Sequence, residues 1–336
     1  MAARRRSATM ADVARVAEVS RTTVSFVLND RPGSAIPEET RRKVLAAAKT
    51  VGYRPNAGAR ALAKRRTGIL GMVTEIVTGP FAAATVVGAQ RRAAQLGRTI
   101  FIMASTGEPE LDKQAFATML EHRVEGIIYA TGSHRAVHLP QEAAELPTVL
   151  VHCFDADTDI PAVLPDEEQA GVLATRALAD AGHRRIGLIE LDPAIPAAVG
   201  RRRGYERILS ECGVPVDESL IVVGGATAQG GYLAARRLLE DHQPPTAIFC
   251  ANDRMAMGAY DAIKERGLSV GRDIAVVGVD NQEIVAEGLR PGLTTVALPF
   301  ESLGRYGVDA LDAMANGKEV PRQQFMDCAL VARQSV

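Results

Sequence analysis

The chain has 336 residues, of which 47% are hydrophobic and 24% charged, a composition typical of globular rather than disordered proteins. No apolar run approaches the roughly 18 residues that a membrane span needs, and no apolar stretch follows the N-terminal arginines as in a secretory signal. We therefore expect a cytoplasmic protein without a membrane partner. The four cysteines never form a Cys-x-x-Cys pair, which argues against a zinc ribbon or a disulfide scaffold.

The net charge of −1 conceals a strong asymmetry along the chain. Residues 1–66 contain 15 Lys and Arg against 5 Asp and Glu, whereas the remainder contains 24 against 35. A cationic head on an acidic body is typical of a protein that binds nucleic acid and carries a separate second domain.

Three short helices are predicted in this head. They are residues 10–17 after a capping Thr9, residues 21–28 after a capping Ser20, and a helix that starts at Pro37 and ends at Gly52. Two short helices joined by a tight turn and closed by a third form a helix-turn-helix. The second helix presents Arg21, Thr22, Thr23 and Ser25 outward, and these side chains suit base edges and phosphates. The head is therefore expected to read double-stranded DNA.

The run from Met10 to Asn29, followed by Gly52–Asn56 and Ala59–Leu62, resembles the lactose-repressor (LacI/GalR) family of transcriptional regulators. The resemblance implies that Arg21 and Thr22 discriminate between operators. It also adds residues to the predicted DNA contacts, namely Tyr53, Asn56, Arg60 and Leu62. One departure is Phe26, which stands where many members carry a guanine-reading arginine. Phe26 either meets a thymine methyl group or packs on the core of the head.

Residues 56–63 are compatible with a hinge helix that is too short to be stable alone, since isolated helices need roughly 12–15 residues. Gly58 weakens this helix by about 1 kcal/mol relative to alanine. The resemblance implies that two such helices from a homodimer enter the minor groove, where Leu62 wedges into a base step. An ordinary hydrophobic contact of Leu62 between head and body is the alternative.

The rest of the chain alternates strand and helix patterns, which predicts parallel sheets covered by helices. We expect an α/β effector domain of two Rossmann-like lobes, which the resemblance likens to periplasmic sugar-binding proteins. The predicted domains are a helix-turn-helix domain at 1–55, a hinge helix and linker at 56–66, and an effector-binding and dimerisation domain at 67–336. Within the last domain, the predicted first lobe covers about 67–164 and 294–325, and the second lobe covers about 165–293.

Four polar residues follow predicted strands or open predicted helices, and ligands bind beyond the carboxyl ends of parallel strands. They are Asp166, Arg201, Asn252 and Asp280. The resemblance implies that these residues, with Phe81, hold a sugar-like effector. Each has a plainer alternative: Asn252-Asp253 can cap a helix, Arg201 can be a solvated helix start, Asp280 can belong to a turn, and Phe81 can pack at a helix start. The aromatic residue that often stacks on a sugar is replaced by Ala226.

Motifs of catalysis and metal binding are absent from the sequence. It contains no Gly-x-Ser-x-Gly, no His-Glu-x-x-His and no P-loop, so neither an enzyme, a cofactor nor a metal site is predicted. His134 and His138 are placed in a surface loop. Asp155–Asp159 begins like a calcium loop, but Ile160 stands where such a loop needs glycine.

Two other functions compete with a regulator controlled by a small molecule. A ligand-binding protein of transport would suit the body alone, but not the cationic head. An enzyme on a Rossmann-like frame lacks a nucleophile or cofactor motif. No leucine heptads follow Val331, so a dimer is expected rather than a tetramer.

Overall fold

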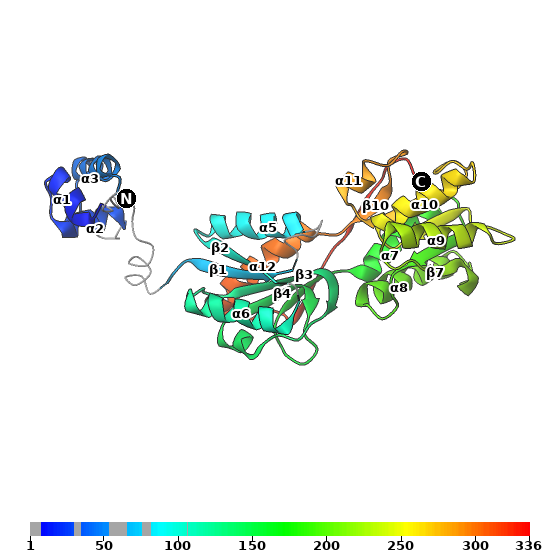
Figure 1. Cartoon of the computed structure of the whole chain (residues 1–336), viewed down its shortest axis with the longest axis horizontal. Helices are drawn as coiled ribbons and strands as arrows, with labels where there is room; N and C mark the ends of the chain where they lie inside the picture. The colour runs from blue at the N-terminus through cyan, green and yellow to red at the C-terminus, as the bar shows by residue number, and fades with distance from the viewer. Residues whose placement is uncertain (1–7, 30–34, 54–65, 76–81, 106) are drawn as a thin grey trace, which may run out of the picture. The chain divides into compact units, whose positions relative to one another are not determined.

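The computed structural model describes residues 8–29, 35–53, 66–75, 82–105 and 107–336. The chain divides into two compact units, Met1–Gly68 and Ile69–Val336 (Figure 1). No helix in the described ranges is long and apolar enough to span a bilayer.

The head contains the three predicted helices, which are α1 (Met10–Ala17), α2 (Arg21–Leu28) and α3 (Glu38–Val51). Their apolar faces form one small core centred on Val13, Val24 and Val44, all fully buried. Glu18 takes a left-handed conformation with a φ of 55°, which lets the chain turn sharply between α1 and α2. The helix-turn-helix predicted from the sequence is thus confirmed.

The first lobe of the second unit is a six-stranded parallel sheet in the order β11-β5-β4-β3-β1-β2. Its strands are β1 (Ile69–Thr74), β2 (Thr99–Ala104), β3 (Ile127–Ala136), β4 (Thr148–Phe154), β5 (Ala162–Pro165) and β11 (Gln323–Met326). Helices α5 (Ala82–Gln95) and α12 (Phe300–Ala315) cover one face of this sheet, while α6 (Pro109–Glu121) covers the other (Figure 1). A short 3-10 helix, η2 (Gln141–Glu145), packs beside α6.

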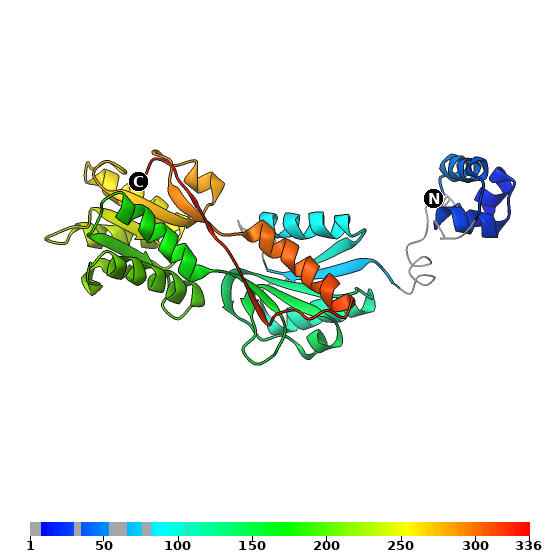
Figure 2. The ribbon, with the colours of Figure 1, turned by 180° about the vertical axis from the view of Figure 1, so that it is seen from behind.

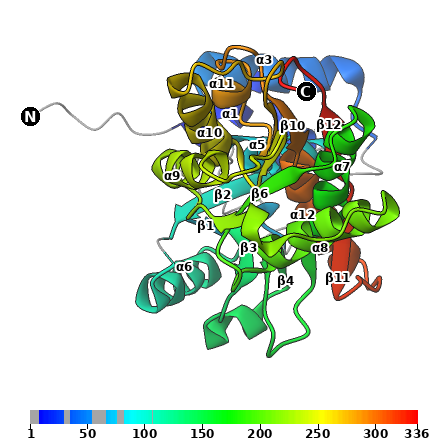
Figure 3. The ribbon, with the colours of Figure 1, turned by 90° about the vertical axis from the view of Figure 1, so that its right-hand side faces the viewer.

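The second lobe repeats this plan with the order β12-β10-β9-β8-β6-β7, in which only the β10–β12 pair is antiparallel. Its strands are β6 (Ile186–Glu190), β7 (Ile221–Val223), β8 (Ala247–Cys250), β9 (Ala275–Asp280), β10 (Thr294–Ala297) and β12 (Ala329–Val331). Its helices are α7 (Glu167–Asp180), α8 (Pro196–Glu211), η3 (Glu218–Leu220), α9 (Ala228–Leu239), α10 (Asp253–Glu265) and α11 (Glu283–Ala286). Figure 3 shows α7 and α8 on one face of this sheet and α9 and α10 on the other.

The two-lobe α/β fold is confirmed, but the predicted lobe boundaries need correction. Residues 294–297 form β10 and belong to the second sheet, so the chain crosses back to the first lobe only after Ala297. It then crosses once more between β11 and β12, as the red C-terminal segment in Figure 2 shows. No strong apolar pattern marks β5, β11 and β12 in the sequence, because each is only three or four residues long and β11 and β12 lie at sheet edges.

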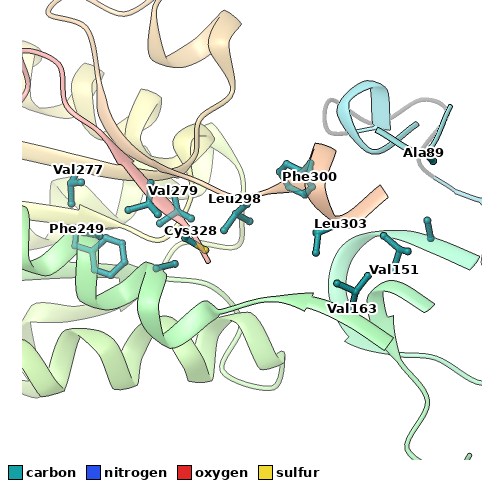
Figure 4. Close-up of a cluster of buried hydrophobic side chains, with 14 of the residues drawn as sticks. Ala89, Val151, Val163, Phe249, Val277, Val279, Leu298, Phe300, Leu303 and Cys328 are labelled. Atoms are coloured by element: carbon teal, nitrogen blue, oxygen red, sulfur yellow. The ribbon is translucent and has the colours of Figure 1, made fainter. Parts of the chain in front are cut away.

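A continuous hydrophobic cluster runs through both lobes where the chain crosses between them. Val151 and Val163 belong to the first sheet, and Phe249 and Val277 belong to the second. Between them lie Leu298 and Cys328 from the crossover segments, and Phe300 and Leu303 from the first turn of α12 (Figure 4). The carboxyl ends of both sets of parallel strands therefore flank a shared apolar hinge region.

Candidate DNA-reading helix and effector cavity

The N-terminal turn of α2 carries the predicted base-reading residues. Ser20 caps this helix, since its hydroxyl accepts a hydrogen bond from the Thr23 amide at 3.0 Å. Arg21 and Thr22 follow directly and are both exposed. The positive end of the helix dipole adds to the arginine charge, so this turn suits a phosphate or the acceptor edge of a guanine.

The hydroxyl groups of Thr23 and Ser25, the other predicted DNA contacts on α2, already lie within hydrogen-bonding distance of neighbours in the head. The hydroxyls of Thr23 and Ser20 are 2.9 Å apart, and the Ser25 hydroxyl accepts from Asn29 Nδ2 at 3.2 Å. Both Thr23 and Ser25 are half-buried. Reading a base with either hydroxyl would therefore compete with a bond inside the helix.

Tyr53 and Phe26 are both half-buried, with different surroundings. Tyr53 packs against the core of the head and its amide donates to the Ala48 carbonyl at 2.9 Å, just beyond Gly52 at the end of α3. Phe26 lies on α2. The predicted contacts Asn56, Arg60 and Leu62, and the effector residue Phe81, lie outside the described residues.

A cavity of about 500 Å³ lies beside the crossover from the first lobe to the second. The residues that line it are His134, Pro165, Asp166, Glu167, Glu168, Ala194, Pro196, Val199, Gly200, Arg203 and Phe325. Its size suits a small molecule, and its mostly apolar wall with a few polar groups is typical of ligand pockets. Of the predicted effector residues that the structure describes, only Asp166 belongs to this wall.

Asp166 opens the second lobe, as predicted. It is the N-terminal cap of α7, since its Oδ1 accepts from the Gln169 amide at 2.8 Å. The carboxylate therefore stabilises the helix start while it also faces the cavity.

Arg201 lies in the second turn of α8, a helix that begins at Pro196 and so starts earlier than its sequence pattern indicated. It is not a solvated helix start, because only 4% of the residue is exposed. Its Nε donates to Glu167 Oε2 at 2.8 Å, and its Nη1 donates to the Ala251 carbonyl at 2.5 Å. Burial opposes the ionisation of Glu167, but Arg201 together with His134 and His152 outweighs burial and lowers the pKa of Glu167 to about 2.

Asn252, and not Asp253, caps α10. Asn252 caps α10 with its Oδ1, which accepts from the Met255 amide at 2.8 Å, and its Nδ2 donates to the Ala226 carbonyl at 3.2 Å. Asp253 is not the cap: it is fully buried, and its carboxylate accepts from Thr295 Oγ1 and from the Gln282 amide. The helix start lies one residue earlier than a cap at Asp253 would require, and Asp253 is therefore a buried carboxylate in the core.

Asp280 ends β9 with a φ of 113°, and Asn281 follows with a φ of 51°. Non-glycine residues seldom adopt such angles, and when they do they often lie at ligand sites. Burial raises the pKa of the Asp280 carboxyl, although the Arg201 charge counteracts it. The predicted turn and the predicted ligand role of Asp280 are thus compatible.

Sequence reasoning missed a histidine pair at the carboxyl ends of β3 and β4. His134 is buried, so its placement in a surface loop was wrong, while His138 is exposed. His152 is buried with a φ of 63°, and neither of its ring nitrogens has a hydrogen-bond partner. Burial lowers the pKa of His152 to about 4. The position of His152 directly after the apolar run 148–151 is the signal that could have identified it.

Family models match both units of the chain. A model described as "Bacterial regulatory proteins, lacI family" matches residues 9–56, and one described as "Periplasmic binding proteins and sugar binding domain of LacI family" matches residues 67–334. The chain belongs to the lacI family. Its members are transcriptional regulators that bind DNA, not enzymes.

Individual relatives in this family match nearly the whole chain. A ribose operon repressor of Haemophilus influenzae is 33% identical over 98% of both chains, and catabolite control protein A of Priestia megaterium is 34% identical over 93% of this chain and 94% of its own. Among solved structures, a lac repressor dimer bound to operator and the anti-inducer ONPF is 29% identical, covers 98% of this chain and 99% of its own, and has a TM-score of 0.78. A CelR–cellobiose complex is 29% identical, covers 98% and 100%, and has a TM-score of 0.70.

Proposed function

We propose that this lacI-family regulator is a cytoplasmic repressor that binds a palindromic operator as a homodimer and responds to a sugar-like effector held between its lobes. Arg21 and Thr22, exposed at the capped start of α2, read base edges in the major groove. This exposed, cationic helix start in a folded helix-turn-helix is the observation that carries the proposal.

Exposed apolar side chains support pairing of two copies of the chain. In the first lobe, Phe101 and Ile102 are exposed on the edge strand β2. In the second lobe, Leu233, Met257 and Ile284 are exposed, the last at 94%. Apolar groups so placed on both lobes suit a long interface between equivalent subunits, which would hold two heads at a fixed separation.

The effector would act by changing the angle between the lobes. Residues 56–63 remain the proposed hinge helix, and Leu62 remains the proposed wedge. The hinge helices of two subunits can pair only when the subunits hold them at the right spacing. Asp166, Arg201, Asn252, Asp280 and Phe81 remain the proposed effector residues. Coupling between ligand and DNA of this kind typically amounts to about 1–3 kcal/mol.

A selection of duplexes from a random library with the purified full chain tests operator recognition. The enriched sites should be palindromes, and their affinity should exceed that of random duplex by at least 10³-fold at moderate salt. Arg21→Ala should lower specific affinity about tenfold or more while leaving non-specific binding nearly unchanged, because a base contact carries sequence information. Arg41→Ala, on α3, serves as a charge-matched control. Absence of any enriched site would contradict the proposal.

A further inference from the structure

The Arg201–Glu167 pair is built into the packing of α7 against α8. A Cβ added at Gly171 would lie 2.2 Å from the Arg201 carbonyl oxygen, and one added at Gly200 would lie 2.5 Å from the Glu167 Cβ. The two helices therefore approach each other closely at the pair. Arg201 is 4% and Glu167 is 5% exposed, so the ion pair is buried between the two helices and is not a surface contact.

The two partners differ in how they face the cavity. Glu167 and His134 belong to its lining, whereas Arg201 does not. Glu167 Oε2 is bound to the guanidinium behind it, while Oε1 has no hydrogen-bond partner and lies 3.4 Å from His134 Nδ1. The cavity lining therefore contains the carboxylate of Glu167 and not the guanidinium of Arg201, and Glu167 Oε1 is itself buried.

We infer that Glu167 makes the cavity select an uncharged polyhydroxylated ligand and exclude sugar acids and sugar phosphates. This inference deepens the proposed function and rests on it, since it assumes that the cavity holds the effector. Glu167 occupies the position on Arg201 that an anionic ligand group would otherwise take.

The charge of the remaining lining supports this selectivity. Three lining residues carry carboxylates, Asp166, Glu167 and Glu168, against one guanidinium, that of Arg203. A ligand anion would have to approach these carboxylates in a partly desolvated space, where like charges repel more strongly than in water. A hydroxyl group, by contrast, carries no charge and can donate a hydrogen bond to a lining carboxylate such as Asp166 or Glu168, and its oxygen can accept from a neighbouring donor.

Isothermal titration of the full chain with matched ligand sets tests the inference. The sets are glucose, glucuronate and glucose 6-phosphate; ribose and ribose 5-phosphate; and cellobiose and cellobionate. At least one neutral member should bind, and its charged counterparts should bind at least tenfold more weakly. In Glu167→Gln, which removes the charge and frees Arg201, this preference should shrink or reverse by tenfold or more.

Two variants control for effects other than charge at this position. Glu167→Asp keeps the charge and should keep the preference for the neutral sugar. Glu211→Gln makes the same charge change in an exposed pair near the end of α8 and should not alter the preference. If Glu167→Gln does not fold, the inference is tested by the ratio of the wild-type affinities for the neutral and charged members of each set.

Three results would overturn the inference: a charged member binding wild type as tightly as its neutral parent, an unchanged ratio in folded Glu167→Gln, or no binding of any neutral member. Operator affinity measured on the same samples separates this failure from failure of the proposed function. Retained operator binding with any of these results would reject only the ligand class.

Discussion

Thr295 Oγ1 donates a hydrogen bond to Asp253 Oδ1 at 2.6 Å, joining the middle of β10 to the start of α10. Both residues are fully buried. The second carboxylate oxygen accepts from the Gln282 amide at 2.7 Å. One carboxylate thus ties together α10, β10 and the segment after β9, at the edge of the second lobe that carries Asp280.

Thr295→Val should destabilise the second unit by about 1–3 kcal/mol, because the isosteric valine leaves a buried carboxylate oxygen without its donor. Urea unfolding followed by circular dichroism measures this. Thr118→Val is the matched control, since the Thr118 hydroxyl donates only to the Gln114 carbonyl within α6. If both variants lost the same free energy of unfolding, the Thr295–Asp253 hydrogen bond would contribute no more than the hydrogen bond within α6.

Asp253 should make stability depend on pH. Burial raises the pKa of the Asp253 carboxyl to about 8, with a further rise from the nearby Asp280. The folded chain then holds a proton that the unfolded chain releases above its ordinary pKa of 3.8, so the free energy of unfolding falls as the pH rises from about 4 to 8. Asp253→Asn should flatten this fall by up to about 1.4 kcal/mol per pH unit. Parallel pH profiles for variant and wild type would refute the assignment.

His152 should have the opposite dependence on pH. Because its folded pKa lies near 4, below the ordinary 6.5, the unfolded chain binds the proton first as the pH falls. Stability contributed by neutral His152 is present above pH 6.5 and is lost progressively between about 6.5 and 4, to a total of about 3 kcal/mol. His152→Asn, which tolerates the positive φ, should remove this loss. Denaturant unfolding of both proteins from pH 4 to 7.5 measures the difference, and an unchanged acid limb would contradict it.

Ser20→Ala should loosen the reading helix of the head. Loss of the cap on α2 costs about 1 kcal/mol, which corresponds to roughly fivefold faster amide exchange in residues 21–28. Ser20→Asp retains an acceptor at the cap and should exchange at nearly the wild-type rate. Hydrogen–deuterium exchange of the full chain measures both, and α12 provides an internal reference. Identical exchange in α2 of all three proteins would mean that the cap does not hold the helix.

Local sequence patterns were sufficient to predict the helices of the head and the fold class of the body. Thr9, Ser20 and Gly52 act on backbone groups within four residues, so local pattern sufficed to place α1, α2 and α3 within a residue or two. Strands β1, β8 and β9 could also be predicted from the sequence, because strands buried on both faces are nearly continuous apolar runs.

The contacts of the polar residues in the body depend on how distant helices and strands pack together. Arg201 was a predicted effector residue, but its hydrogen-bond partner Glu167 lies 34 positions earlier and meets it through the packing of two helices. The same holds for His134 beside Glu167, and for Thr295, which lies 42 residues beyond Asp253. Such pairs form only when particular strands and helices become neighbours. The packing of the whole hydrophobic core determines those neighbours, so the sequence around either residue does not predict its partner.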